Sequence, residues 1–135
     1  MPRIEWNDSL KLGVAKLDKQ HEKLVGLMND LFDACTQGRG ADVVEEAIFE
    51  AHDYIDYHFT SEQRLMEEYE YPDLGEHVDE HDDYIVQAAD DFAVLREGAG
   101  DEAREVLERL TGWWVEHIGG PDRGLADFLR AQGLK

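Results

Sequence analysis

Hydrophobic residues recur at steps of three and four along most of this chain, which is the spacing of one face of an α-helix. Four such runs cover residues 17–35, 44–65, 74–95 and 103–117. Segments rich in glycine or proline separate them: Gln37-Gly38-Arg39-Gly40, Tyr71-Pro72, Gly98-Ala99-Gly100 and Gly119-Gly120-Pro121. Glycine and proline commonly end helices. The pattern therefore predicts four helices joined by short connections.

The two ends of the chain follow other patterns. In residues 1–16, apolar side chains occupy alternate positions around the turn-forming triplet Asn7-Asp8-Ser9; they are Ile4, Trp6, Leu10, Leu12 and Val14. Because no partner strand is evident, we expect an extended N-terminal arm that lies against the core. Residues 122–135 carry Leu125, Phe128 and Leu129 at helical spacing, which predicts a short C-terminal helix.

These elements predict an all-α fold. Helices joined by short connections pack most simply as an up-down-up-down antiparallel four-helix bundle. We expect one domain over residues 1–135, with the arm at 1–16, the bundle at 17–119 and the tail helix at 122–135.

Ionisable residues occupy positions on the predicted apolar faces, where burial is costly unless they are paired or bind a metal. They are His21, His58, Glu62, His77, His81 and His117. A single one of them would be an ordinary hydrogen-bonded core residue. In an antiparallel bundle, however, the starts of the odd helices and the ends of the even helices meet, so all six side chains should converge. The sixth histidine, His52, lies on another face and is read as an ordinary surface or half-buried residue.

The spacing of these residues favours metal binding. His58 and Glu62, like His77 and His81, are four residues apart and project from one face of a helix. Asp122 follows His117 by five residues, and we expect a break at Gly119-Gly120-Pro121 to bring it back to the site. Five imidazoles and two carboxylates exceed the four ligands of a tetrahedral zinc site. They suit two ions of iron, manganese, cobalt or zinc, with the carboxylates bridging.

Composition narrows the function classes. The 135 residues include 13 basic and 32 acidic side chains, a formal net charge of −19, which argues against binding to nucleic acid or anionic membranes. No stretch longer than six residues lacks a charged side chain, so we expect no membrane insertion. The N-terminus lacks an apolar signal segment. Cys35 is the only cysteine, which fits a cytoplasmic protein, and with no obvious exposed apolar stripe we expect a monomer.

The motifs together resemble those of hemerythrins, in particular the single-domain bacterial form. The matching elements are Trp6-Asn7 with Asp18-x-Gln20-His21, then His58-Phe59-x-x-Glu62, His77-x-x-x-His81 and His117-Ile118-x-x-x-Asp122. Myohemerythrin is itself a known four-helix bundle, so agreement in fold adds no independent support. Arg123 and Leu125 stand where family members often carry lysine and tyrosine.

The resemblance implies reversible dioxygen binding at two non-haem iron ions, Fe²⁺ or Fe³⁺, joined by an oxo or hydroxo bridge. One iron would be held by His77, His81 and His117, and the other by His21 and His58. Glu62 and Asp122 would bridge the pair. Such a site needs an apolar wall, for which the sequence offers Leu24, Met28, Ile55, Phe59, Ile85, Trp113, Trp114 and Ile118. Of these, Trp114 and Ile118 are the preferred pocket residues.

The leading hypothesis is a non-enzymatic protein for oxygen storage, oxygen transport or delivery to an oxygen-consuming enzyme. A di-iron oxidase, a peroxidase or a nitric-oxide-handling enzyme ranks second. Ferritin-like di-iron enzymes use Glu-x-x-His pairs, and this chain has none. An oxygen or redox sensor ranks third, because we expect a sensor to carry an output domain.

Overall fold

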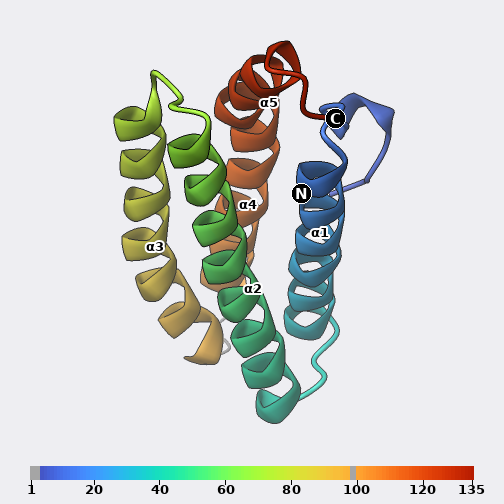
Figure 1. Ribbon diagram of the computed structural model, residues 1–135. Coiled ribbons are helices and arrows are strands. Elements are labelled where there is room, and N and C mark those ends of the chain that lie inside the picture. Colours follow the sequence, from blue (N-terminus) through green and yellow to red (C-terminus); the bar gives the residue numbers. More distant parts are fainter. Residues whose placement is uncertain (1–3, 98–99) are drawn as a thin grey trace.

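Four long helices lie side by side in the computed structural model, which describes residues 4–97 and 100–135 (Figure 1). They are α1 (Ala15–Thr36), α2 (Ala41–Glu68), α3 (Leu74–Glu97) and α4 (Gly100–His117). A shorter helix, α5 (Arg123–Ala131), follows α4 at the end of the bundle where the N-terminal arm also lies. The described residues form no strand, and the predicted all-α four-helix bundle is confirmed.

The N-terminal arm lies against the bundle as expected, interrupted by one short 3-10 turn, η1 (Asp8–Leu10). Asn29 of α1 anchors it with two hydrogen bonds, because its side chain accepts from the Ile4 amide at 2.9 Å and donates to the Ile4 carbonyl at 2.8 Å. The Asp18 carboxylate accepts from the amides of Leu12 at 2.7 Å and Gly13 at 3.1 Å. These bonds tie the arm to α1, which begins at Ala15, two residues before the expected bundle boundary.

The connection between α1 and α2 uses glycine as expected. Gly38, with φ of 61°, adopts the left-handed conformation just beyond the end of α1. Of the expected stop at Gly98-Ala99-Gly100, Gly98 and Ala99 lie outside the described residues, as do residues 1–3 of the arm, and α4 begins at Gly100.

The end of α4 differs from the expected break. Residues Ile118–Asp122 form a π-helical turn, η2, so the chain runs helically from α4 through Pro121 into α5. In an α-helix, residues five apart point about 140° away from each other. The wider π-turn, with its i to i+5 hydrogen bonds, instead brings them toward the same face. It thereby places Asp122 beside His117 without a break in the helix.

The core runs the length of the bundle and continues under the arm and α5. One prediction about it is wrong: Ile85, expected inside, is 39% exposed, whereas its neighbour Tyr84 is buried. Two successive steps of four residues from His77 rotate Ile85 by about 80°, while Tyr84, seven residues on, returns to the inner face.

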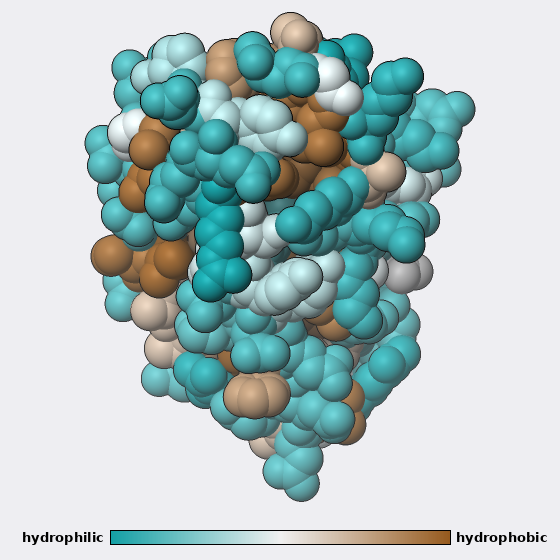
Figure 2. Space-filling model, in the orientation of Figure 1, coloured by the Kyte–Doolittle hydropathy of each residue, from teal (hydrophilic) through white to brown (hydrophobic). Residues whose placement is uncertain are grey.

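The outer surface is mostly hydrophilic on the face shown in Figure 2, where hydrophobic side chains form small, separate areas. This agrees with a charged shell around an apolar core. Among the described residues, no helix is long and apolar enough to cross a membrane.

Candidate metal centre

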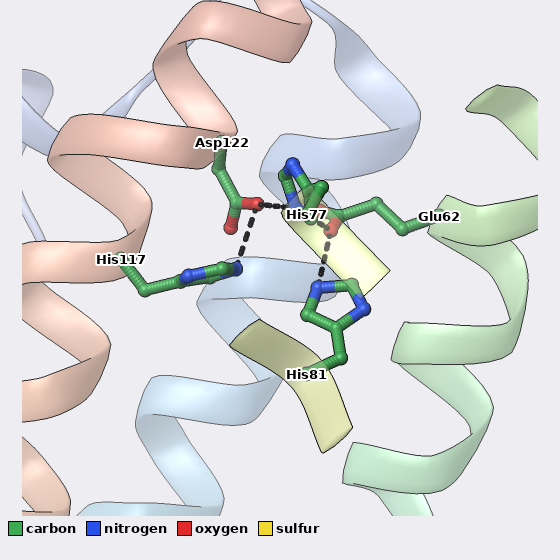
Figure 3. Close-up of side chains that lie close together, drawn as sticks. All are labelled: Glu62, His77, His81, His117 and Asp122. Atoms are coloured by element: carbon green, nitrogen blue, oxygen red, sulfur yellow. Dashed lines mark hydrogen bonds and ion pairs between the residues drawn. The ribbon is translucent and has the colours of Figure 1, made fainter. Parts of the chain in front are cut away.

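The bundle brings all seven predicted ligand residues together at one end. α1 contributes His21, α2 contributes His58 and Glu62, α3 contributes His77 and His81, and the joined α4 and η2 contribute His117 and Asp122. Each of the seven is 2% exposed or less. Figure 3 shows five of them, from three of these elements, pointing toward a common centre.

Glu62 divides its two carboxylate oxygens between two sets of histidines. Its Oε1 lies 3.0 Å from His77 Nε2 and 3.1 Å from His81 Nε2. Its Oε2 lies 3.3 Å from His58 Nε2 and 3.6 Å from His21 Nε2. A carboxylate so placed presents one oxygen to each of two neighbouring positions.

Asp122 is divided in the same way. Its Oδ1 lies 3.0 Å from His77 Nε2 and 3.1 Å from His117 Nε2. Its Oδ2 lies 2.9 Å from His21 Nε2. Both carboxylates therefore separate His77, His81 and His117 from His21 and His58.

Two overlapping groups of potential metal ligands result. In each group, one donor atom per residue lies within 4.8 Å of every other. The first group, called the three-histidine group below, contains His77, His81 and His117; the second, the two-histidine group, contains His21 and His58; Glu62 and Asp122 belong to both. This is the division that the sequence resemblance implied.

Many polar atoms in the cluster lack hydrogen-bond partners within the described part of the chain. They include Nε2 of His21, His58, His81 and His117, Oε2 of Glu62 and both oxygens of Asp122. These atoms are close together yet out of hydrogen-bonding geometry, although burial of such atoms is normally costly. Imidazole nitrogens and carboxylate oxygens that converge on one space fit a pair of first-row transition-metal ions.

The pKa values of the cluster also favour a site for positive charge. Burial alone would lower the pKa of His21, but the carboxylates of Asp122 and Glu62 outweigh it and raise that pKa to about 9. The same carboxylates overcome burial at His77 and raise its pKa to about 10. Although burial favours the neutral acids, contacts with the histidines hold the pKa of Glu62 and of Asp122 below the usual range. Two buried carboxylates thus attract positive charge, which protons supply when no metal is bound.

A second set of polar residues surrounds the outer nitrogens of the histidines, and their sequence positions alone predict no role for them. Gln20 Oε1 lies 2.7 Å from His58 Nδ1, and Gln20 Nε2 donates to Ser61 Oγ at 3.0 Å. Gln63 Nε2 lies 3.3 Å from His81 Nδ1. Two signals in the sequence could have found them: Gln20 belongs to the Asp18-x-Gln20-His21 element of the resemblance, and Ser61 and Gln63 flank Glu62.

The predicted apolar wall is largely present. Phe59 stacks on His81 with ring centroids 3.8 Å apart and lies 5.5 Å from the Trp114 ring. Trp113 is half-buried and stacks on His117 at 4.3 Å. Five further members are buried in the core, namely Leu24, Met28, Ile55, Trp114 and Ile118. Ile85 is the exception, because its side chain turns outward.

The remaining residues singled out in the sequence make other contacts. His52 is exposed and lies near the Phe92 ring. Arg123 donates to the Ser9 carbonyl at 3.0 Å and so contacts the arm. Leu125 is fully buried.

Comparison with known proteins is consistent with this cluster. Residues 12–129 match the family model described as the hemerythrin HHE cation binding domain. The chain is 33% identical to bacteriohemerythrins from Stenotrophomonas maltophilia and Pseudomonas aeruginosa, over 97% and 96% of its length and 84% of theirs. A crystal structure of a hemerythrin point mutant superimposes with a TM-score of 0.83 at 25% identity, covering 96% of this chain and 98% of that one.

Proposed function

The chain belongs to the hemerythrin family, and we propose that it binds dioxygen reversibly at two non-haem iron ions. The observation that carries this proposal is the division of Glu62 and Asp122 between unequal groups of histidines. Unequal groups leave one metal with fewer protein ligands than the other, which favours binding of a small external molecule at the poorer one.

The residues take separate roles in this proposal. His77, His81 and His117 would hold one iron, His21 and His58 would hold the other, and Glu62 and Asp122 would be shared by both. The description of the matched family model as cation-binding supports this assignment, as do the unpartnered nitrogens and oxygens of the cluster. When bound, the iron pair supplies electrons to dioxygen and recovers them on release.

The surrounding apolar side chains would keep water away from the bound metals. Phe59 and Trp114 close the cluster off with aromatic surface, and Ile118, next to His117, is buried as well. Exclusion of water limits side reactions and the loss of electrons from the iron pair. Cys35 lies near the far end of α1 and takes no part in the cluster.

We further propose that the protein is a monomeric, cytoplasmic, non-enzymatic oxygen carrier for storage, transport or delivery to an oxygen-consuming enzyme. Within the cluster, both carboxylates face histidines with each of their oxygens. Neither carboxylate is therefore left over as a general acid for turnover. Because both carboxylates would serve as metal ligands, the cluster favours reversible binding over catalysis.

Oxygen uptake by the iron-loaded protein tests the proposal. The protein is reduced anaerobically with dithionite, freed of reductant and titrated with dioxygen, and its visible spectrum is followed. We expect uptake of one dioxygen per pair of irons and return of the starting spectrum under argon. Irreversible uptake with hydrogen peroxide in the medium would place the enzymatic alternative ahead.

A further inference from the structure

Gln20 forms a buried link between a predicted ligand and the neighbouring helix. Its side chain is 5% exposed and lies where α1 packs against α2. The amide oxygen is 2.7 Å from His58 Nδ1, and the amide nitrogen donates to Ser61 Oγ at 3.0 Å. Both ends of the amide are therefore engaged, with the oxygen toward His58 and the nitrogen toward Ser61.

The orientation of this amide determines where His58 carries its proton. With the amide in this orientation, Oε1 accepts, so His58 Nδ1 donates and holds a proton. The neutral ring then has its lone pair on Nε2, the atom that faces Glu62 Oε2 at 3.3 Å. A ring with its proton on Nε2 instead could not bind a metal there.

We propose that Gln20, braced by Ser61, is the positioning residue of the two-histidine group, holding His58 in its metal-binding form. This inference rests on the metal centre of the proposed function. Hydrogen bonds of this kind to metal-bound histidines orient the ring and raise its basicity.

Among the described residues, no equivalent arrangement is found at His21, His81 or His117. His21 Nδ1 has no hydrogen-bond partner among the described residues. Gln63 presents its amide nitrogen, a donor, to His81 Nδ1 at the longer distance of 3.3 Å. Glu80, whose side chain is 47% exposed, approaches His117 Nδ1 only to 3.5 Å. Gln20 is therefore the partner with the closest and most buried contact.

The position of this contact makes its effect selective. The two-histidine group has only His21 and His58 besides the shared carboxylates, whereas the other group has three histidines. Weakening His58 removes half of the histidine ligation from one metal and none from the other. Loss of Gln20 should therefore weaken one metal site while the other persists.

The neutral amide also fits the charge of the site. Glu62 and Asp122 already place two carboxylates in a fully buried space. A third carboxylate at position 20 would accept the same hydrogen bond but would draw the His58 proton toward itself and make the ring a stronger donor. A Gln20→Glu variant should therefore keep both metals and lower the reduction potential of the iron pair.

Zinc is the probe for the experiment, because a diamagnetic ion does not broaden the NMR signals of the histidine rings. The test therefore depends on neither iron nor oxygen. Gln20→Leu removes the oxygen that accepts from His58, at nearly constant side-chain size, whereas Gln20→Glu keeps an oxygen there. Ser61→Ala removes the hydroxyl that bonds to the other end of the Gln20 amide. Gln87→Leu is the matched control, since Gln87 is exposed on α3 and bonds to Asp91. Each protein is examined by nitrogen-15 NMR of the histidine rings, without metal and with zinc, and is then titrated with Zn²⁺.

The wild-type and Gln87→Leu proteins should show a protected proton on His58 Nδ1 and bind two zinc ions. Gln20→Leu should lose that protection and bind one zinc ion about 10- to 100-fold more weakly, with the second unchanged. Gln20→Glu should recover both properties, and Ser61→Ala should show a smaller loss than Gln20→Leu.

Two results would overturn the inference. One is a wild-type His58 whose Nδ1 carries no proton, with or without metal, because Gln20 would then act as a donor. The other is a folded Gln20→Leu variant with two zinc sites of wild-type affinity. Failure of the iron protein to bind oxygen would count against the proposed function and leave these measurements intact.

Discussion

His117 and Asp122 face each other across one turn of continuous helix, with Nε2 of the histidine 3.1 Å from Oδ1 of the aspartate. They are five positions apart in the chain, and the π-turn Ile118–Asp122 is what brings both side chains to the inner face. Such wide turns often occur at functional sites. Here the turn makes a single helical stretch supply a ligand to the three-histidine group and a carboxylate shared by both groups.

Asp122→Asn should lose metal binding at both positions. The amide keeps one oxygen but has a donor NH2 group in place of the other. It therefore cannot bridge two cations. We expect affinity for both metals to fall, measured as iron per chain after dialysis against a chelator. Asp127→Asn, at an exposed position of α5, is the control that should keep both irons. Two tightly held irons in Asp122→Asn would rule out a bridging role.

His77→Ala should empty the three-histidine group. His77 Nε2 lies 3.0 Å from an oxygen of each carboxylate, so its loss also leaves both of them short of a partner. We expect fewer than two irons per chain and a metal-free protein destabilised by about 3–5 kcal/mol, the usual cost of breaking a buried pair. His52→Ala, which removes an exposed histidine, should change neither quantity. An iron content of two in His77→Ala would refute the ligand assignment.

The metal-free protein should become less stable as the pH rises above neutrality. The pKa values of His21, about 9, and His77, about 10, exceed the unfolded value of about 6.5. Their protons stabilise the folded state fully below pH 6.5, and that stabilisation is lost as the pH rises through 9 to 10. Each histidine contributes a slope of up to about 1.4 kcal/mol per pH unit.

Urea unfolding between pH 6 and pH 10 measures this effect, with the metal-loaded protein as the reference. Because metal ions replace the protons, the loaded protein should show a smaller decline over the same range. Equal slopes in the two forms would show that the histidine protons do not stabilise the metal-free cluster.

Phe59→Ala should damage both stability and the protection of the site. The Phe59 ring is buried and stacks on His81, so its removal leaves a cavity beside a ligand. We expect a loss of about 3–5 kcal/mol in the free energy of unfolding and faster oxidation of the reduced iron protein in air. The matched variant Phe49→Ala lies on the same helix but is 67% exposed, and should change stability by no more than about 0.5 kcal/mol. An unchanged oxidation rate in Phe59→Ala would argue against its role in the wall.

Sequence periodicity predicted the bundle well, because apolar steps of three and four continue through all four long helices. The same pattern located the cluster, since His21, His58, Glu62, His77, His81 and His117 interrupt apolar faces at ends that an antiparallel bundle brings together. These predictions needed only helix geometry and the order of the chain.

Other features depended on information that periodicity does not contain. Gly119-Gly120-Pro121 was expected to break the helix, whereas the chain continues as a π-turn, and local preference does not distinguish the two. Ile85 was assigned inward by repeated steps of four, which drift around a helix of 3.6 residues per turn. The contact of Gln20 with His58 joins residues 38 apart in the chain, so only packing of α1 on α2 reveals it.

We propose that two metals occupy the cluster, one in each histidine group, with Glu62 and Asp122 between them. Diffraction from crystals of the iron-loaded protein, recorded at the iron absorption edge, tests it most directly. We expect two anomalous peaks, one beside His77, His81 and His117 and the other beside His21 and His58. A single peak, or iron bound elsewhere on the protein, would contradict it.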